Sequence, residues 1–318
     1  MRTIFCGTPQ FAVPTLEKLV AEGFEVALVL TNPDEPMGRG HRVQAPPVKQ
    51  CAKRLQLPIF QPSKLKTDPV RERLTEVQPE AIVVAAYGHI IPKWMIELPR
   101  LGCINLHASL LPKYRGAAPI QWALINGEKV TGNTTMQIDT GLDTGPMLLN
   151  QRVEITSDET TETLSQKLSG PGAELMVETL RKLDRGRLRP QPQDGSQATL
   201  APMLKRSDGL IDWTLPADRI FGRVRGLRPW PGAFTAFRGR HLHLWRVAPA
   251  SESPTSATPG PEVFPVGTVI QSRAGLFAAC VDGNWLELKE VQLEGRKRIT
   301  GRDFANGVRL QPAERLGT

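Results

Sequence analysis

Polar side chains occupy alternate positions where an apolar run of the sequence ends. Asn105, His107 and Ser109 place an amide, an imidazole and a hydroxyl at every second residue of 102-GCINLHASLLPKYRGAAPIQWA-123. A carboxylate, Asp143, follows in a glycine-rich loop. Groups of these types stabilise an oxyanion and transfer a proton, provided that the fold brings them together.

The chemistry that these groups suit is acyl transfer to an amine. An asparagine amide donates a hydrogen bond to a developing oxyanion, and a histidine exchanges a proton near neutral pH. An aspartate beside the ring favours its protonated form and receives a proton directly or through water. Asn105, His107 and Asp143 would therefore support direct transfer without a serine or cysteine nucleophile. Taken singly, each is more often structural, and Asp143 would be a turn residue.

Alternating apolar runs and helical patterns predict the elements that hold these groups. Continuous apolar runs at 2–6, 26–30, 81–86 and 102–106 are separated by amphipathic stretches. This order is typical of α/β proteins with a Rossmann-like, mostly parallel sheet covered on both faces. Ligands of such sheets bind beyond the carboxyl ends of the strands, where the pattern places Asn105 and the residues after it.

The chain length and one biased segment predict two domains. With 318 residues, the chain is long enough for two separate cores. A stretch rich in proline, glutamine and serine predicts a linker at 190–207. We expect 1–189 to form a Rossmann-like catalytic domain. Short β-like runs after the linker predict an OB-like β-barrel at 208–318.

Several classes of protein are disfavoured by the motifs that the sequence lacks. No apolar run approaches the roughly 18 residues of a membrane span, and no G-x-G-x-x-G or G-x-x-x-x-G-K-[ST] loop occurs. The 5 histidines have no cysteine or carboxylate at ligand spacing, so we expect no metal. The 4 scattered cysteines and a strand-like N-terminus predict a cytoplasmic protein with reduced thiols.

The net charge of +8 is concentrated in the second part of the chain. From Lys205 onward there are 17 basic residues against 11 acidic ones. Seven arginines between Arg219 and Arg246 have no acidic residue among them. Such an excess indicates a polyanionic partner, with nucleic acid the first candidate, although a solvated arginine-rich face is the plain alternative.

The segment 105-NLHASLLPKYRG-116 resembles the signature of the formyltransferases that use 10-formyltetrahydrofolate. A second segment, 135-TMQIDTGLDTGPML-148, is similar to their second catalytic segment. The resemblance continues in chain order through GTPQFAVPTL, 84-VAAYGHIIP-92, IDW and RPWPG. It therefore covers nearly the whole chain and implies a Rossmann-like domain followed by an OB-like barrel. Asn133 departs from the pattern, because an apolar residue would suit its strand better.

By this resemblance, Asn105, His107 and Asp143 carry the catalytic roles. The formyl donor, 10-formyltetrahydrofolate, would occupy a pocket that includes residues 109–112, with a second loop closing over the pterin. The residues expected at this pocket are Ser109, Leu110, Leu111, Pro112, Tyr87, Gly88 and Ile90.

Members of the family formylate different amines, and two features favour initiator methionyl-tRNA as the acceptor here. The first is the loop of about sixteen residues at 34–49, and the second is the arginine-rich barrel. The residues expected to contact tRNA are Arg39, Arg42, Arg223, Arg225, Arg228, Arg238 and Arg240. An amino-sugar-nucleotide formyltransferase and a catalytically silent RNA-binding module are the alternatives. A chain that clamps one tRNA is expected to be a monomer.

Overall fold

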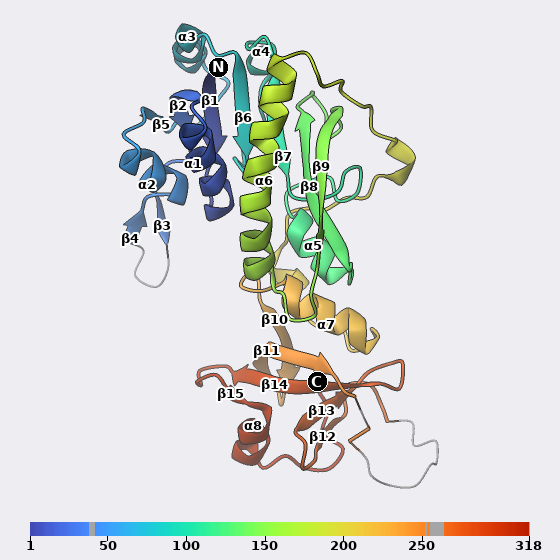
Figure 1. The fold of residues 1–318 in the computed structure, drawn as a ribbon. Helices are drawn as coiled ribbons and strands as arrows, with labels where there is room; N and C mark the ends of the chain where they lie inside the picture. The colour runs from blue at the N-terminus through green and yellow to red at the C-terminus, as the bar shows by residue number, and fades with distance from the viewer. Residues whose placement is uncertain (38–41, 252, 255–263, 318) are drawn as a thin grey trace. The chain divides into compact units, whose positions relative to one another are not determined.

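The computed structural model describes every residue except 38–41, 252, 255–263 and 318. Backbone packing divides the chain into two compact units, whose elements are labelled in Figure 1. The first unit comprises Met1–Pro119, Val130–Ile155 and Leu164–Pro202. The second comprises Ile120–Lys129, Thr156–Thr163 and Met203–Thr318.

The first unit is built on a seven-stranded sheet with the order β5–β2–β1–β6–β7–β8–β9. Neighbours from β5 to β7 pair in parallel, whereas β7, β8 and β9 pair antiparallel. The strands are β1 Arg2–Gly7, β2 Glu25–Leu30, β5 Ile59–Phe60, β6 Ala81–Ala85, β7 Cys103–His107, β8 Val130–Gln137 and β9 Met147–Glu154. The prediction of a mostly parallel, Rossmann-like sheet is confirmed.

Helices cover the sheet because its central strands are apolar along their whole length. All five residues of β6 are buried, as expected for a parallel strand with both faces packed. The long helix α6 runs along the sheet beside β6 and β7 in Figure 1. The helices are α1 Val13–Ala21, α2 Pro47–Arg54, α3 Asp68–Val77, α4 Lys93–Ile96 and α6 Thr161–Asp184. No helix in the described part of the chain is long and apolar enough to span a membrane.

The side-chain nitrogen of the buried residue Asn133 on β8 has a hydrogen-bond partner, whereas the side-chain oxygen has none among the described residues. Pro171 lies inside α6, where proline interrupts the regular hydrogen bonds of a helix. The Asn133 Nδ2 atom donates to the Leu168 carbonyl of that helix at 2.9 Å. The asparagine at this position, where an apolar residue was expected, thus supplies a hydrogen-bond donor to the turn of α6 that precedes Pro171.

Residues 190–202, which we expected to belong to a linker, pair instead with the first unit. The backbones of Gln191 and Met147 exchange two hydrogen bonds of 2.8 Å. The Ala201 amide donates to the Arg115 carbonyl, and the Ala201 carbonyl accepts from the Ala118 amide. The backbone groups of residues 190–202 bond to other loops rather than to a regular strand ladder. The segment therefore has no periodic sequence pattern. The division between the units falls between Pro202 and Met203, inside the expected linker.

The segment 34–49 is more regular than the loop we expected. Two short strands, β3 Glu35–Met37 and β4 Arg42–Gln44, pair antiparallel. The residues that join them, 38–41, lie outside the described part of the chain.

The second unit contains an antiparallel sheet with the order β10–β11–β14–β13–β12, to which β15 is added beside β14. The strands are β10 Ala233–Phe237, β11 Arg240–Pro249, β12 Val269–Gln271, β13 Leu276–Ala279, β14 Trp285–Leu293 and β15 Ile299–Thr300. The prediction of an OB-like β domain after the Rossmann-like one is confirmed.

This part of the chain also contains three helices, of which α7 and α8 were not predicted. They are α5 Pro119–Ile125, most of which belongs to the second unit, α7 Ala217–Gly226 and α8 Gly301–Val308. In α7, buried Ile220 and Val224 recur at helical spacing, which the density of arginines around them obscured. Arg223 and Arg225 therefore lie on a helix and not on a strand of the barrel.

Candidate active site

Strand β7 carries two of the three expected catalytic residues to the carboxyl edge of the sheet. Asn105 pairs with Val84 on one side and Met136 on the other, and His107 pairs with Thr134. Residues two apart on a strand face the same side of a sheet, so Asn105 and His107 share one face. Asn105 is half-buried, and His107 is 5% exposed.

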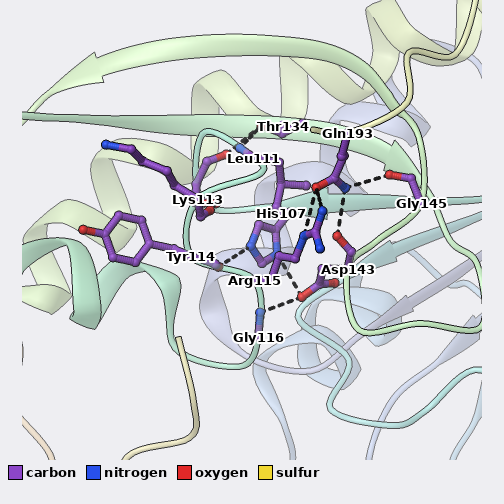
Figure 2. A network of polar contacts seen from close by, with 11 residues as sticks. His107, Leu111, Lys113, Tyr114, Arg115, Gly116, Thr134, Asp143, Gly145 and Gln193 are labelled. Carbon is purple, nitrogen blue, oxygen red and sulfur yellow. Dashed lines mark hydrogen bonds and ion pairs between the residues drawn. The ribbon is translucent and has the colours of Figure 1, made fainter. Parts of the chain in front are cut away.

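A backbone carbonyl holds the His107 ring. Its Nε2 atom lies 2.9 Å from the carbonyl oxygen of Tyr114 (Figure 2). Because a carbonyl only accepts hydrogen bonds, Nε2 must carry a hydrogen. The other ring nitrogen, Nδ1, is therefore the one that gains or loses a proton, and it faces Asp143.

The loop between β8 and β9 brings Asp143 to this ring. The distance from Asp143 Oδ2 to His107 Nδ1 is 3.7 Å, and the two side chains are 20% and 6% exposed. This separation allows an ionic interaction but is too long for a direct hydrogen bond. The same Oδ2 atom accepts a hydrogen bond of 2.8 Å from the Gly116 amide.

The turn role that Asp143 would have had belongs to Asp139. The Asp139 carboxylate accepts from the Gly141 amide at 2.9 Å and from the Thr144 hydroxyl at 2.8 Å. Asp143 itself adopts a left-handed conformation with φ of 50°. Such a conformation is unusual outside glycine and asparagine, and it directs this carboxylate to His107 and Gly116.

The segment expected at the folate pocket is fixed by hydrogen bonds of its own. The hydroxyl of Ser109 donates to the Lys113 carbonyl at 2.6 Å. Thr134 on β8 donates to the Ser109 carbonyl at 2.7 Å and accepts from the Leu111 amide at 3.2 Å. Leu111 is buried, whereas Leu110 and Pro112 are half-buried and leave apolar surface next to His107.

The loop expected to close over the pterin contains one core residue and one exposed one. Tyr87 is 2% exposed and packs in the core of the first unit, where burial raises the pKa of its phenol. Its hydroxyl has no hydrogen-bond partner among the described residues. Gly88 has a φ of 81°, and Ile90 is 86% exposed. Of the three, Ile90 offers the most surface to a ligand.

The expected tRNA-binding arginines differ in how much surface they offer. Arg39 lies outside the described residues, and Arg42 begins β4. Arg225 is 9% exposed and donates to the carbonyls of Thr156 at 3.0 Å and Glu159 at 3.2 Å. Burial lowers the pKa of Arg225 from its ordinary value, and also that of Arg223. Both hydrogen bonds of Arg225 go to backbone carbonyls of the protein itself, which indicates a structural role.

The remaining arginines are more accessible. Arg223 donates to the Asp208 carbonyl at 2.7 Å and is half-buried. Arg228 lies 3.6 Å from Glu162, and exposed Arg240 donates to the Glu294 carbonyl. Exposed Arg238 is paired at 2.6 Å with Glu314, which raises the pKa of its guanidinium.

Two residues that we did not single out, Gln193 and Arg115, lie beside the expected catalytic residues. Gln193 bridges the Asp143 loop to Arg115, as Figure 2 shows. Gln193 follows a proline in a stretch without periodicity, so only its tertiary contacts distinguish it from its neighbours.

No group of three or more metal-ligating side chains occurs among the described residues.

Comparison with known proteins gives the family. The family model described as formyl transferase matches residues 1–180, and the model of the formyl transferase C-terminal domain matches residues 203–309. A methionyl-tRNA formyltransferase of Acidobacterium capsulatum is 54% identical, with 100% of both chains covered. The chain belongs to the methionyl-tRNA formyltransferase family. A relative of the same name from Solibacter usitatus is 52% identical over 100% of this chain and 99% of its own.

Solved structures share the fold. A methionyl-tRNA formyltransferase from Clostridium thermocellum gives a TM-score of 0.55 at 20% identity, covering 78% of this chain and 93% of its own. The sugar 3N-formyl transferase WlaRD, solved with dTDP and 5-N-formyl-THF, gives 0.66 at 15% identity over 93% and 99%. At these identities the likeness concerns the fold alone.

Proposed function

We propose that this protein transfers the formyl group of 10-formyltetrahydrofolate to the α-amino group of initiator methionyl-tRNA. The product is N-formylmethionyl-tRNA, which serves translation initiation. The observation that carries the proposal is the 54% identity, over the full length of both chains, to a relative of that name. The pairing of His107 with Asp143 at the end of β7 suits the chemistry.

In this scheme the amine of methionine attacks the formyl carbon, and the carbonyl oxygen becomes an oxyanion. Asn105 donates an amide hydrogen to that oxygen, and protonated His107 donates from Nδ1, because Nε2 is held by Tyr114. The intermediate then collapses, the bond from carbon to the folate nitrogen breaks, and the new amide remains on the methionine.

Asp143 is the proton acceptor in the proposed reaction. Its carboxylate faces the Nδ1 atom of His107 at 3.7 Å, and it receives a proton of the attacking amine through a water molecule. The expelled folate nitrogen takes up one proton, so the overall transfer neither consumes nor releases protons. The Asp143 side chain is 20% exposed, so solvent water can reach it.

A folate donor is supported by two solved structures of the same fold that contain folates. WlaRD was solved with 5-N-formyl-THF, and a HypX structure with tetrahydrofolic acid. We assign the donor pocket to the segment of Ser109, Leu110, Leu111 and Pro112, of which Leu110 and Pro112 are half-buried, closed by the loop that includes Tyr87, Gly88 and Ile90. No metal is needed, since Asn105 and His107 supply the oxyanion donors.

For tRNA we retain the arginines of the second unit with accessible guanidinium groups, Arg228, Arg238 and Arg240, together with half-buried Arg223. Arg39 and Arg42 remain proposed contacts of the 34–49 segment. We propose that the protein acts in the cytoplasm as a monomer, for which size-exclusion chromatography with light scattering is the test.

The function is tested by offering the purified protein 10-formyltetrahydrofolate with two acceptors in parallel, methionyl-tRNA and an amino-sugar nucleotide. We expect formylation of methionyl-tRNA only, measured as formylmethionine released after deacylation. Replacement of Asn105, His107 or Asp143 by alanine should lower turnover by about 10²- to 10³-fold with unchanged unfolding. Consumption of the sugar acceptor, or of neither, would contradict the proposal.

A further inference from the structure

Residues 190–202 hold the loop that follows β7. Thr199 accepts a hydrogen bond from the Tyr114 amide at 2.8 Å through its hydroxyl. Its carbonyl accepts from the Arg115 amide at 2.8 Å, and the Ala201 amide donates to the Arg115 carbonyl at 2.7 Å. Tyr114, whose carbonyl binds the His107 ring, is therefore anchored by this segment.

Gln193 of the same segment binds the second catalytic loop. Its Nε2 atom donates to the Asp143 carbonyl at 2.8 Å and to the Gly145 carbonyl at 2.7 Å. Its Oε1 atom accepts from the Arg115 guanidinium, at 3.0 Å from Nε and 2.8 Å from Nη2 (Figure 2). Both amide hydrogens and both oxygen lone pairs are thus used.

These contacts join the loop after β7, which holds the His107 ring, to the loop that supplies Asp143. On the loop after β7, Tyr114, Arg115 and Gly116 are consecutive. The first binds the ring of His107, the second binds Gln193, and the third binds the carboxylate of Asp143. Gln193 in turn binds the backbone of Asp143 itself.

The pair does not hold itself in place. His107 Nδ1 and Asp143 Oδ2 are 3.7 Å apart, beyond hydrogen-bond distance, so their separation is imposed by the surrounding backbone. Catalysis is sensitive to displacements of this size, since about 1 Å of misplacement can lower a rate by about 10²-fold.

We infer that Gln193, acting through Arg115 and the Asp143 loop, is a positioning residue that sets the distance between Asp143 and His107. This inference deepens the proposed function and rests on it for its kinetic test. Gln193 touches neither His107 nor the Asp143 carboxylate, so its effect passes through backbone carbonyls and the Arg115 side chain.

Two substitutions separate the contacts. Gln193→Glu keeps a partner for Arg115 but loses the two amide donors to the loop carbonyls, and Gln193→Met keeps the volume and loses all four bonds. The matched control is Gln197→Ala in the same segment, because Gln197 donates only to Asp194 at 2.9 Å. We expect both Gln193 variants to lower kcat by about 10- to 100-fold, while KM for either substrate changes by less than about threefold.

A readout without substrate distinguishes this inference from the proposed function. The titration of the His107 imidazole, followed by NMR and assigned with His107→Asn, should move in both Gln193 variants and stay unchanged in Gln197→Ala. Unchanged kcat and an unchanged imidazole titration in both variants would overturn the positioning role. If the wild-type protein formylates no methionyl-tRNA, the proposed function fails, and the imidazole titration still decides the role of Gln193.

If Gln193→Met fails to fold, Gln193→Glu alone decides. A folded Gln193→Glu protein with wild-type kcat and imidazole titration refutes the inference. A lowered kcat with unchanged KM and a shifted titration supports it, because a merely structural defect would lower the amount of active protein without moving the titration.

Discussion

The hydrogen bond from His107 to the Tyr114 carbonyl determines which ring nitrogen is available for the proposed reaction. With Nε2 committed at 2.9 Å, the proton that matters is on Nδ1, and the nearest carboxylate oxygen is that of Asp143. The carbonyl, rather than the aspartate, therefore orients the ring. Asp143 is left to act through its charge and as a proton acceptor.

The substitution Asp143→Asn removes the negative charge of this side chain and keeps its size. The amide oxygen of asparagine still accepts from the Gly116 amide, so the loop should keep its position and the unfolding free energy should change little. Without a carboxylate, the amine proton of the proposed reaction has no acceptor. We expect kcat to fall by about 10²-fold or more, measured by single-turnover formylation.

The control is Asp139→Asn, in the same loop and with the same change of charge. Asp139 binds only its own turn, through Gly141 and Thr144. If Asp139→Asn lowered kcat as much as Asp143→Asn, the loop charge as a whole would matter and the specific role of Asp143 would be wrong.

At the scale of elements, the turn after β7 depends on Gly116. This residue has a φ of 124°, and a Cβ atom added to it would lie 2.6 Å from the Ala201 carbonyl oxygen. Gly116→Ala should therefore lower the free energy of unfolding by about 1–3 kcal/mol, measured by urea titration. It should also lower kcat, because the Gly116 amide binds the Asp143 carboxylate.

Gly170→Ala is the matched comparison for that change. Gly170 is exposed in α6, and an added Cβ would meet no atom within 4 Å. Alanine is favoured over glycine in a helix by about 1 kcal/mol, so stability should stay equal or rise. Equal stability of Gly116→Ala and the wild-type protein would show that the turn after β7 relaxes without cost.

At the scale of the whole molecule, the charge of +8 indicates a polyanionic partner, but the arginines that produce it are not equivalent. Arg225 is buried against two backbone carbonyls, whereas Arg240 is exposed on β11. Arginines that bind phosphates make binding steeply dependent on salt, and each lost phosphate contact lowers the slope by about one.

Arg240→Ala and Arg225→Ala should therefore separate tRNA affinity from stability. We expect Arg240→Ala to weaken the binding of methionyl-tRNA and to reduce its salt slope by about one, with unfolding almost unchanged. Arg225→Ala should lower the free energy of unfolding by about 1–3 kcal/mol, because it removes a buried side chain together with its hydrogen bonds to the Thr156 and Glu159 carbonyls. Titrations of methionyl-tRNA binding over a salt series give the salt slope, and urea titration gives the free energy of unfolding. An unaltered salt slope in Arg240→Ala would remove this residue from the proposed contacts.

The sequence alone was sufficient for the sheet and for the candidate catalytic residues. Continuous apolar runs are dictated by burial on both faces, so the bounds of four strands of the first unit, β1, β2, β6 and β7, were predicted to within one residue. Asn105, His107 and Asp143 were found because polar groups at the end of a buried strand, and in a glycine-rich loop, stand out locally.

Only the tertiary structure decided what holds those residues. Gln193 acts through hydrogen bonds to residues some fifty or more positions away, and its segment lacks the periodicity that burial on a regular surface produces. The burial of Arg225 was equally hidden, since helix α7 and the carbonyls around it belong to separate parts of the chain. Periodic packing leaves a local record in the sequence, whereas a hydrogen bond between distant loops leaves none.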